Sequence, residues 1–193
     1  MAQYLNKITQ TDNLIINSMI NLAKQKGLNK VTISDIVAEA HINRSTFYRH
    51  FIDKDDLIEK SENMILNRIY DYHNQMVSTK LRYLKMTDQQ QFSLKTFLTI
   101  IDDNHEIISF FLSNKSDSSF SYKLIDLFLK MTYESWDYLL PNRKKIDRKL
   151  FAYYSFGAII ATIKLWVDNY DDYSKEDIYN FILTIRNNEI QNL

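Results

Sequence analysis

The sequence predicts an all-α fold, because turn residues are scarce and apolar residues recur at helical spacing. Only two glycines and one proline occur among 193 residues, whereas an all-β fold needs turn residues roughly every 8–12 positions. Ile15 and Met19 lie on one face of a helix expected over residues 11–27. We expect an N-terminal three-helix domain over residues 1–53 and a C-terminal helical domain over residues 54–193.

Local signals place the individual helices. Gly27 suits the end of the first helix, Thr32 and Asn43 are candidate N-caps of two short helices, and Pro141 ends a longer one. The clearest loop is SNKSDSS at residues 113–119. The expected helices cover residues 11–27, 32–40, 43–51, 54–80, 92–104, 106–112, 120–140, 147–168 and 174–186.

Composition excludes several kinds of chemistry. The chain has no cysteine, which excludes disulfides, thiolate zinc sites and a cysteine nucleophile. Gly27 and Gly157 are too far apart for a glycine-rich phosphate loop. The N-terminus lacks the apolar run of a signal peptide, and the longest uncharged stretch, Leu150–Ile163, is 14 residues long where a membrane span needs about 20. We expect a cytoplasmic protein with no membrane segment, metal site or cofactor.

Residues 32–54 carry the most informative pattern in the chain. Short helices are separated by a tight turn at His41-Ile42, as in a helix-turn-helix, whose second helix enters the major groove of DNA. At about 100° per residue, Ser45 and Arg49 lie nearly opposite Phe47 on the third helix of the chain. Four further side chains flank this outer face: Arg44, Thr46, Tyr48 and His50.

The chemistry of this outer face suits DNA. Arginine can read guanine in the major groove, and hydroxyl groups can contact bases or phosphates. The whole chain is neutral, with 24 Lys+Arg and 24 Asp+Glu. Residues 41–54, however, contain Arg44, Arg49 and Lys54 but only one acidic residue, Asp53, so this segment has a net charge of +2. Lys54 and Thr32 each stand at the start of a helix, where a phosphate is favoured. The alternative is an ordinary solvated helix surface.

This segment resembles the DNA-binding domain of the TetR family of transcriptional regulators. The resemblance rests on residues 36–40, 42–51 and 53–57, and it covers about residues 11–58, beyond which only the helical layout is similar. The family usually has glycine where this chain has His41, a residue that tolerates left-handed backbone better than most.

The resemblance implies a role for each matching residue. Ser45, Thr46 and Arg49 would face bases, with Arg44 at the edge of the groove. The phosphate contacts would come from Thr32, Tyr48, His50 and Lys54. Phe47 and Phe51 would belong to the core of the domain.

The second domain is expected to form a homodimer. The helix expected over residues 147–168 is apolar around most of its circumference, so it must be buried on more than one side. Gly157 and Ala161 would let another helix approach closely, and together with Phe181 and Ile185 they resemble the two-helix dimer face of the family. Two-fold symmetry would then require an approximately palindromic operator. The alternative is a helix at the centre of a monomer.

Aromatic residues of the second domain suggest a pocket for a small apolar or aromatic ligand. The candidate lining residues are His105, Phe110, Phe128, Tyr133, Trp136 and Tyr154; the alternative is that they are ordinary core. The family resemblance implies a repressor that a ligand releases from its operator by tilting the helix that begins at Lys54. Some regulators of this architecture instead activate transcription or respond to a protein partner.

An enzyme is the main rival to a regulator. A di-iron site in a helical bundle needs paired Glu-x-x-His motifs, and only Asp102 and His105 have a comparable spacing. The sequence contains no GxSxG nucleophile elbow. We therefore expect no catalytic residues.

Overall fold

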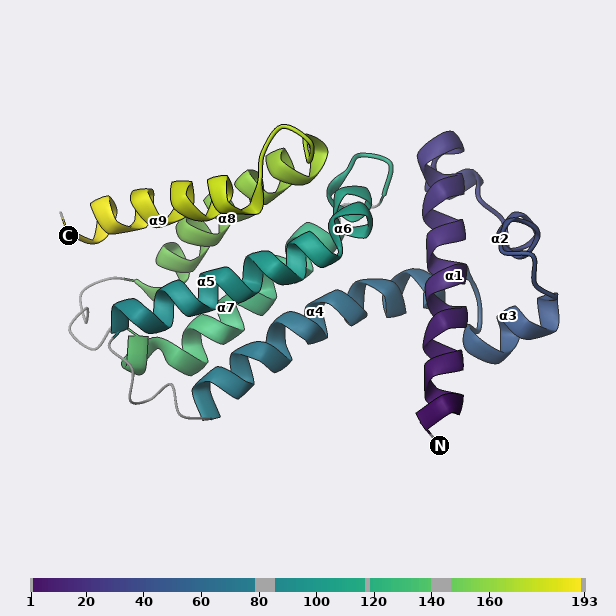
Figure 1. Ribbon diagram of the computed structural model, residues 1–193, viewed down its shortest axis with the longest axis horizontal. Coiled ribbons are helices and arrows are strands. Elements are labelled where there is room, and N and C mark those ends of the chain that lie inside the picture. The colour runs from purple at the N-terminus through teal and green to yellow at the C-terminus, as the bar shows by residue number, and fades with distance from the viewer. Residues whose placement is uncertain (1, 79–85, 117–118, 140–146, 192–193) are drawn as a thin grey trace. The chain divides into compact units, whose positions relative to one another are not determined.

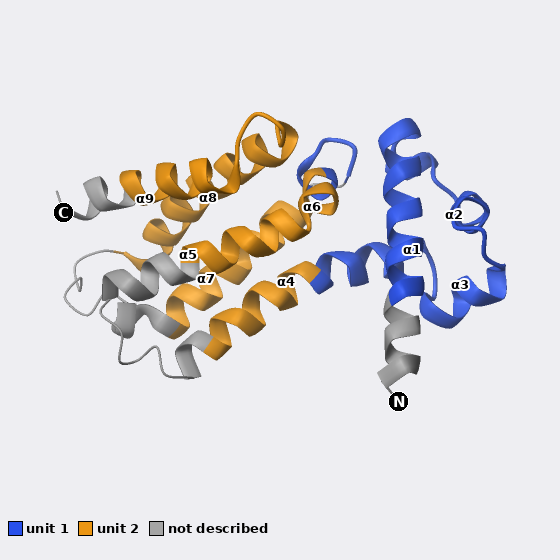
Figure 2. Ribbon diagram, viewed as in Figure 1, with its two compact units in different colours: residues 1–64, 110–118 blue, residues 65–109, 119–193 orange. Residues whose placement is uncertain are grey.

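The computed structural model describes residues 2–78, 86–116, 119–139 and 147–191, and in these ranges its regular secondary structure is entirely helical (Figure 1). The chain divides into two compact units (Figure 2). Unit 1 comprises residues 1–64 and 110–118, and unit 2 comprises residues 65–109 and 119–193. The expected all-α fold is thus confirmed.

Unit 1 contains α1 (Ala2–Lys26), the short 3₁₀ helix η1 (Leu28–Lys30), α2 (Ile33–Glu39) and α3 (Arg44–His50). The first helix begins well before the expected residue 11, because neither glycine nor proline interrupts the chain there. It ends at Lys26, and the next residue, Gly27, has a φ of 82°, in backbone that favours glycine.

The core of unit 1 includes large, fully buried side chains from α1, α2 and α3, among them Ile15 and Met19 from α1, Ile36 from α2 and Phe47 from α3. Burial of each such side chain contributes about 1.5–3 kcal/mol relative to exposure. Because α3 contributes its Phe47 side to this core, its opposite side must face outwards.

Unit 1 also includes the segment that follows α6 (His105–Leu112). In this segment the Nζ of Lys115 donates to the carbonyl oxygen of Lys24 at 2.7 Å, and the Lys115 carbonyl accepts from the N–H of Leu28 at 3.4 Å. Carbonyl groups at the end of a helix have no helical partners. Lys115 therefore caps the C-terminal end of α1.

One helix of the chain, α4 (Lys54–Ser78), begins in unit 1 and continues into unit 2. The sequence places the domain boundary at residue 53, just before this helix, whereas the compact units divide within it, after Met64. The connection between the units at this point is therefore helical rather than a loop.

Unit 2 is built mainly from α5 (Met86–Asp103), α7 (Ser119–Leu139), α8 (Arg148–Asp168) and α9 (Lys175–Gln191). The most extensive helix pairing is between α7 and α8, and α5 lies beside α9 (Figure 1). These bounds agree closely with the helices expected after residue 119, because the caps and apolar spacing that define them are local.

Aromatic rings link three helices of unit 2. The ring of Phe128 on α7 lies 5.5 Å from that of Phe97 on α5 and 4.4 Å from that of Phe156 on α8, measured between ring centres. Phe128 is buried. This aromatic contact is therefore part of the core of the unit.

A second polar and aromatic contact joins the end of α5 to the turn after α8. The hydroxyl of Tyr170 donates to Asp102 at 2.5 Å, and this hydrogen bond raises the pKa of Tyr170 to about 12. The Nζ of Lys175 lies 2.9 Å from the other oxygen of Asp102. The ring of His105 stacks on Tyr170 at 3.8 Å. These contacts fix the α8–α9 turn within unit 2.

Candidate nucleic-acid interface

The α3 helix presents the outer face that the sequence predicts. Phe47 is completely buried and Phe51, just beyond the helix, is 3% exposed. On the opposite side Ser45 and Arg49 are exposed. Thr46, the third residue predicted to face bases, is half-buried, and Arg44, predicted at the edge of the groove, is exposed. Unit 1 therefore offers a cationic, hydroxyl-rich surface on a helix that its apolar side holds in place.

The turn between α2 and α3 has left-handed backbone at His41, the position where the family usually has glycine. His41 has a φ of 51° and is the one described non-glycine residue with positive φ. The N–H of Ile42 donates to the carbonyl oxygen of Val37 at 3.0 Å, which closes the turn. Asn43 occupies the N-cap position of α3, but its side chain makes no capping hydrogen bond. The tight turn of the helix-turn-helix is thus formed without glycine.

Thr32 is the N-cap of α2, where its hydroxyl both donates and accepts a hydrogen bond. Its Oγ1 accepts from the N–H of Asp35 at 3.2 Å and donates to the Asp35 carboxylate at 2.7 Å. The same carboxylate accepts from the Thr32 N–H, which completes a capping box. The predicted phosphate contact of Thr32 stays a prediction, and it would require a Thr32 donor to exchange the Asp35 carboxylate for the phosphate.

Lys54, the first residue of α4, binds the segment between α1 and α2. Its Nζ donates to the carbonyl oxygens of Leu28 at 3.2 Å and Val31 at 3.1 Å. A lysine ammonium has three N–H donors, so one remains for a phosphate. Lys54 therefore joins the start of α4 to η1 while keeping its positive charge at a helix N-terminus.

The last two predicted phosphate ligands differ in their access to solvent. Tyr48 is 53% exposed. His50 lies at the end of α3, and its Nδ1 is 2.7 Å from the Asp12 carboxylate of α1. Its side chain is only 6% exposed. Because the carboxylate can only accept, Nδ1 donates to it, and Nε2 is the ring nitrogen left for DNA.

Two partners of the predicted DNA-binding residues were not anticipated from the sequence. Asp12 binds His50 across 38 positions, and Ser34 on α2 accepts a hydrogen bond from Arg44 across ten positions. Neither spacing corresponds to a helical period, so no sequence signal could have joined these residues.

The described residues predicted to line a ligand pocket differ in burial and in the unit to which they belong. Tyr133 is 51% and Tyr154 is 68% exposed, while Phe110 is buried and belongs to unit 1. Phe128 and His105 take part in the contacts of unit 2 described above. The side chain of Trp136 lies outside the described residues. The sequence could not separate these cases, because aromatic residues at helical spacing mark a core as readily as a cavity.

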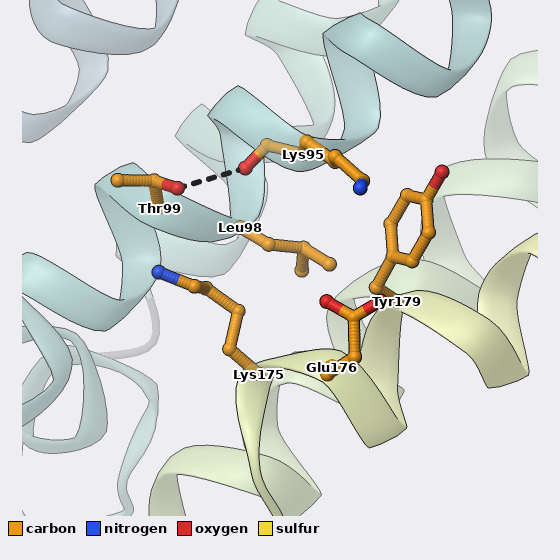
Figure 3. Close-up of a pocket in the computed structure, with 6 residues that line it drawn as sticks. All are labelled: Lys95, Leu98, Thr99, Lys175, Glu176 and Tyr179. Carbon is orange, nitrogen blue, oxygen red and sulfur yellow. Dashed lines mark hydrogen bonds between the residues drawn. The ribbon is translucent and has the colours of Figure 1, made fainter.

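A small cavity between α5 and α9 is lined by other residues. It measures about 90 Å³, well below the roughly 300–1,000 Å³ of typical ligand sites. Figure 3 shows its lining: Lys95, Leu98, Thr99, Lys175, Glu176 and Tyr179. The ammonium of Lys95 lies 4.7 Å from the centre of the Tyr179 ring, and Lys175 is paired with Asp102. Both lysines that line the cavity therefore already have partners within the chain.

The predicted dimer residues lie on exposed parts of α8 and α9. Ala161 is exposed and Gly157 half-buried, and Phe181 and Ile185 are 55% and 43% exposed. Helix α8 is also the one described helix long and apolar enough to cross a membrane, by length and composition only. A helix that packs on two sides has the same composition.

No group of three or more potential metal ligands occurs among the described residues.

The outward polar face of α3, its buried aromatic side and the tight turn before it together define a DNA-binding regulator of the helix-turn-helix class.

Comparison with models of known protein families identifies the family to which the chain belongs. Residues 15–60 match the model of bacterial regulatory proteins of the tetR family, and residues 87–188 match a model of a transcriptional regulator C-terminal region. The chain belongs to the TetR family of transcriptional regulators. No curated protein sequence gives a significant match.

Solved structures share this fold along most of their length. A protein classed as a TetR-family regulator from Syntrophomonas wolfei has a TM-score of 0.70 at 16% identity, with 92% of this chain and 93% of that one covered. A TetR regulator from Streptococcus agalactiae has a TM-score of 0.60 at 20% identity, covering 96% and 98%. The regulator FadR from Bacillus subtilis, solved with stearoyl-CoA, has a TM-score of 0.62 at 15% identity, covering 89% and 95%.

Proposed function

We propose that the protein is a dimeric transcriptional repressor that binds a palindromic operator and is released by a small apolar ligand. The observation that carries the DNA-binding part is the outward face of α3, where Ser45 and Arg49 reach solvent while Phe47 is buried. On this proposal Arg49, Ser45 and Thr46 contact bases, and Tyr48 and Lys54 contact phosphates. Such a regulator acts in the cytoplasm, on chromosomal DNA.

The apolar outer face of α8 supports the dimer. Leu150, Tyr154 and Leu165 are 72%, 68% and 53% exposed, and at positions i, i+4 and i+15 they fall on one side of the helix. Ala161 lies on the same side. Soluble monomers rarely expose a large contiguous apolar patch, so we propose that this face and the exposed part of α9 pack against a second copy. The dimer then places two α3 helices about 34–36 Å apart, in successive major grooves.

The ligand part of the proposal is supported by family and by helix continuity. The structurally similar FadR was solved with stearoyl-CoA, and α4 runs without interruption from unit 1 into unit 2. On this proposal a ligand bound in unit 2 favours a conformer in which α4 tilts and the two α3 helices no longer match adjacent grooves. A ligand can shift this balance only by its difference in affinity for the two conformers.

Selection of bound duplexes from a random pool tests the proposal. We expect an enriched motif with two-fold symmetry, bound by two chains per duplex in sedimentation analysis. An enriched but asymmetric half-site bound by one chain would contradict the dimer, and the absence of any enriched sequence would contradict the regulator.

The same selected duplex tests ligand release. Stearoyl-CoA added to the protein–duplex complex is expected to lower the bound fraction, as measured by fluorescence anisotropy. An unchanged bound fraction at saturating stearoyl-CoA would contradict a ligand of the acyl-CoA class, while leaving DNA binding intact.

A further inference from the structure

One hydrogen bond connects the two helices of the helix-turn-helix at the predicted DNA surface. The guanidinium Nη2 of Arg44, the first residue of α3, donates to the Oγ of Ser34 in the first turn of α2. Both residues are exposed. This contact lies outside the apolar core of unit 1, to which α2 and α3 contribute the fully buried side chains of Ile36 and Phe47.

The nearby carboxylate, Asp35, is committed to other partners. It lies 2.8 Å from the Nζ of Lys26 and accepts from the N–H and hydroxyl of Thr32 at 2.8 and 2.7 Å. The Lys26 contact and then the Thr32 hydrogen bonds hold the pKa of Asp35 far below its usual range. Arg44 is therefore held by a neutral hydroxyl rather than by a carboxylate, and its positive charge is not offset by an ion pair with its neighbour.

The physical effect of such a contact is pre-organisation. A free arginine side chain carries about 2 kcal/mol of rotamer entropy, and ordering it on binding lowers affinity. The Ser34 hydroxyl uses one of the five N–H donors of the guanidinium. If α3 enters the groove as proposed, the remaining donors would be held at the groove edge, where a planar fork can bind a base bidentately.

We propose that Ser34 is a positioning residue that holds Arg44 in place for base recognition. On this account the preference for one base pair in each half-site depends on a neutral side chain that itself touches no base. The inference rests on the proposed operator binding through α3, but it concerns a residue that this proposal does not include.

The test compares base-by-base binding profiles of variants on the duplex that the wild-type protein selects. Arg44→Ala identifies the base pair that Arg44 reads. Ser34→Ala and Ser34→Cys remove the good acceptor at nearly constant size, whereas Ser34→Thr keeps the hydroxyl and serves as the matched control. Thermal unfolding of each variant checks that unit 1 remains folded.

We expect Ser34→Ala and Ser34→Cys to lower the preference at the Arg44 base pair by roughly three- to tenfold, the range for one lost hydrogen bond. Affinity for a scrambled duplex and the salt dependence should stay at the wild-type level, because no charge is removed. Ser34→Thr should restore the preference, and Ser34→Ala should add nothing in an Arg44→Ala background.

Four results would overturn the inference. A lost preference at a different base pair would mean that Ser34 contacts DNA itself, and tighter operator binding by Ser34→Ala would mean that the hydrogen bond holds Arg44 away from DNA. Additive effects of the two substitutions would show independent roles. A wild-type profile for Ser34→Ala would show no role. Failure of the wild-type protein to select any motif would instead overturn the proposed function.

Discussion

Single residues on the surface of unit 1 differ in how much of their hydrogen-bonding capacity is already used. Arg49 and Ser45 are exposed on α3, whereas the Thr32 hydroxyl already donates to Asp35 in its capping box and the Nδ1 of His50 is bound to Asp12. A residue type at a matching position therefore does not define a contact by itself. The atoms left over after intramolecular bonding decide which groups can bind DNA.

His73 on α4 leads to a prediction about pH. Its side chain is buried, its Nε2 has no hydrogen-bond partner, and it lies 3.7 Å from a carboxylate oxygen of Glu134. Burial lowers the pKa of His73 from its ordinary value of 6.5, and Glu134 opposes this shift only in part. Below pH 6.5 the unfolded chain then takes up a proton that the folded chain resists, so the free energy of unfolding should fall as the pH falls.

The variant His73→Phe keeps a ring and removes the titration. We expect its melting temperature to match or exceed that of the wild type at pH 8, because an unpaired buried polar atom is lost. Between pH 6.5 and 5.5 it should decline less than that of the wild type. An equal decline in both proteins, measured by circular dichroism, would show that other groups account for the pH dependence.

At the scale of elements, the sequence predicted most helices because the signals involved are local. Thr32 caps the helix that it is expected to open, and the two faces of α3 follow from helical spacing alone. Contacts between elements are harder to predict from the sequence. The hydrogen bonds of Lys54 to Leu28 and Val31 span more than 20 positions, and nothing in the sequence indicates them.

Removing the Lys54 side chain should affect both the fold and DNA binding. Lys54→Ala loses two charge-assisted hydrogen bonds between α4 and the segment before α2, which we expect to lower the free energy of unfolding by about 1–2 kcal/mol. It should also weaken binding to all duplexes alike and reduce the salt slope by about one unit. Urea denaturation and salt titrations measure these two effects. Unchanged stability would contradict the structural role, and an unchanged salt slope would contradict the phosphate contact.

At the scale of the whole molecule, the sequence predicts which helices carry apolar surface. It does not predict which part of that surface packs inside the unit and which part stays exposed. Helix α8 is apolar on nearly every side, so spacing could not say which residues face its own unit. Tyr154 was expected to line a pocket, yet it is exposed on the same side of α8 as Ala161. The predicted pocket stays a prediction, and among its described residues Tyr154 lies on an outer face of α8 while Phe128 takes part in an aromatic core contact.

The proposed dimer face can be tested by placing a charge within it. Ala161→Arg introduces a long cation onto the exposed apolar side of α8, where a close helix–helix contact would have to bury it without a partner. We expect monomers in sedimentation velocity and weaker binding to a two-half-site duplex. Asp71→Arg, at an exposed position on α4, is the matched control and should remain dimeric. A dimer that persists in Ala161→Arg would place the interface elsewhere.

The central claim is that the outer face of α3 reads DNA sequence, and the most direct measurement is the affinity of Arg49→Ala for the selected operator and for a scrambled duplex. We predict a loss of about 1–3 kcal/mol on the operator and a much smaller loss on the scrambled duplex. Arg49→Lys, which keeps the charge but not the planar fork, should also lose preference for the operator. Wild-type affinities of Arg49→Ala for both duplexes, or an equal loss on both, would contradict the claim.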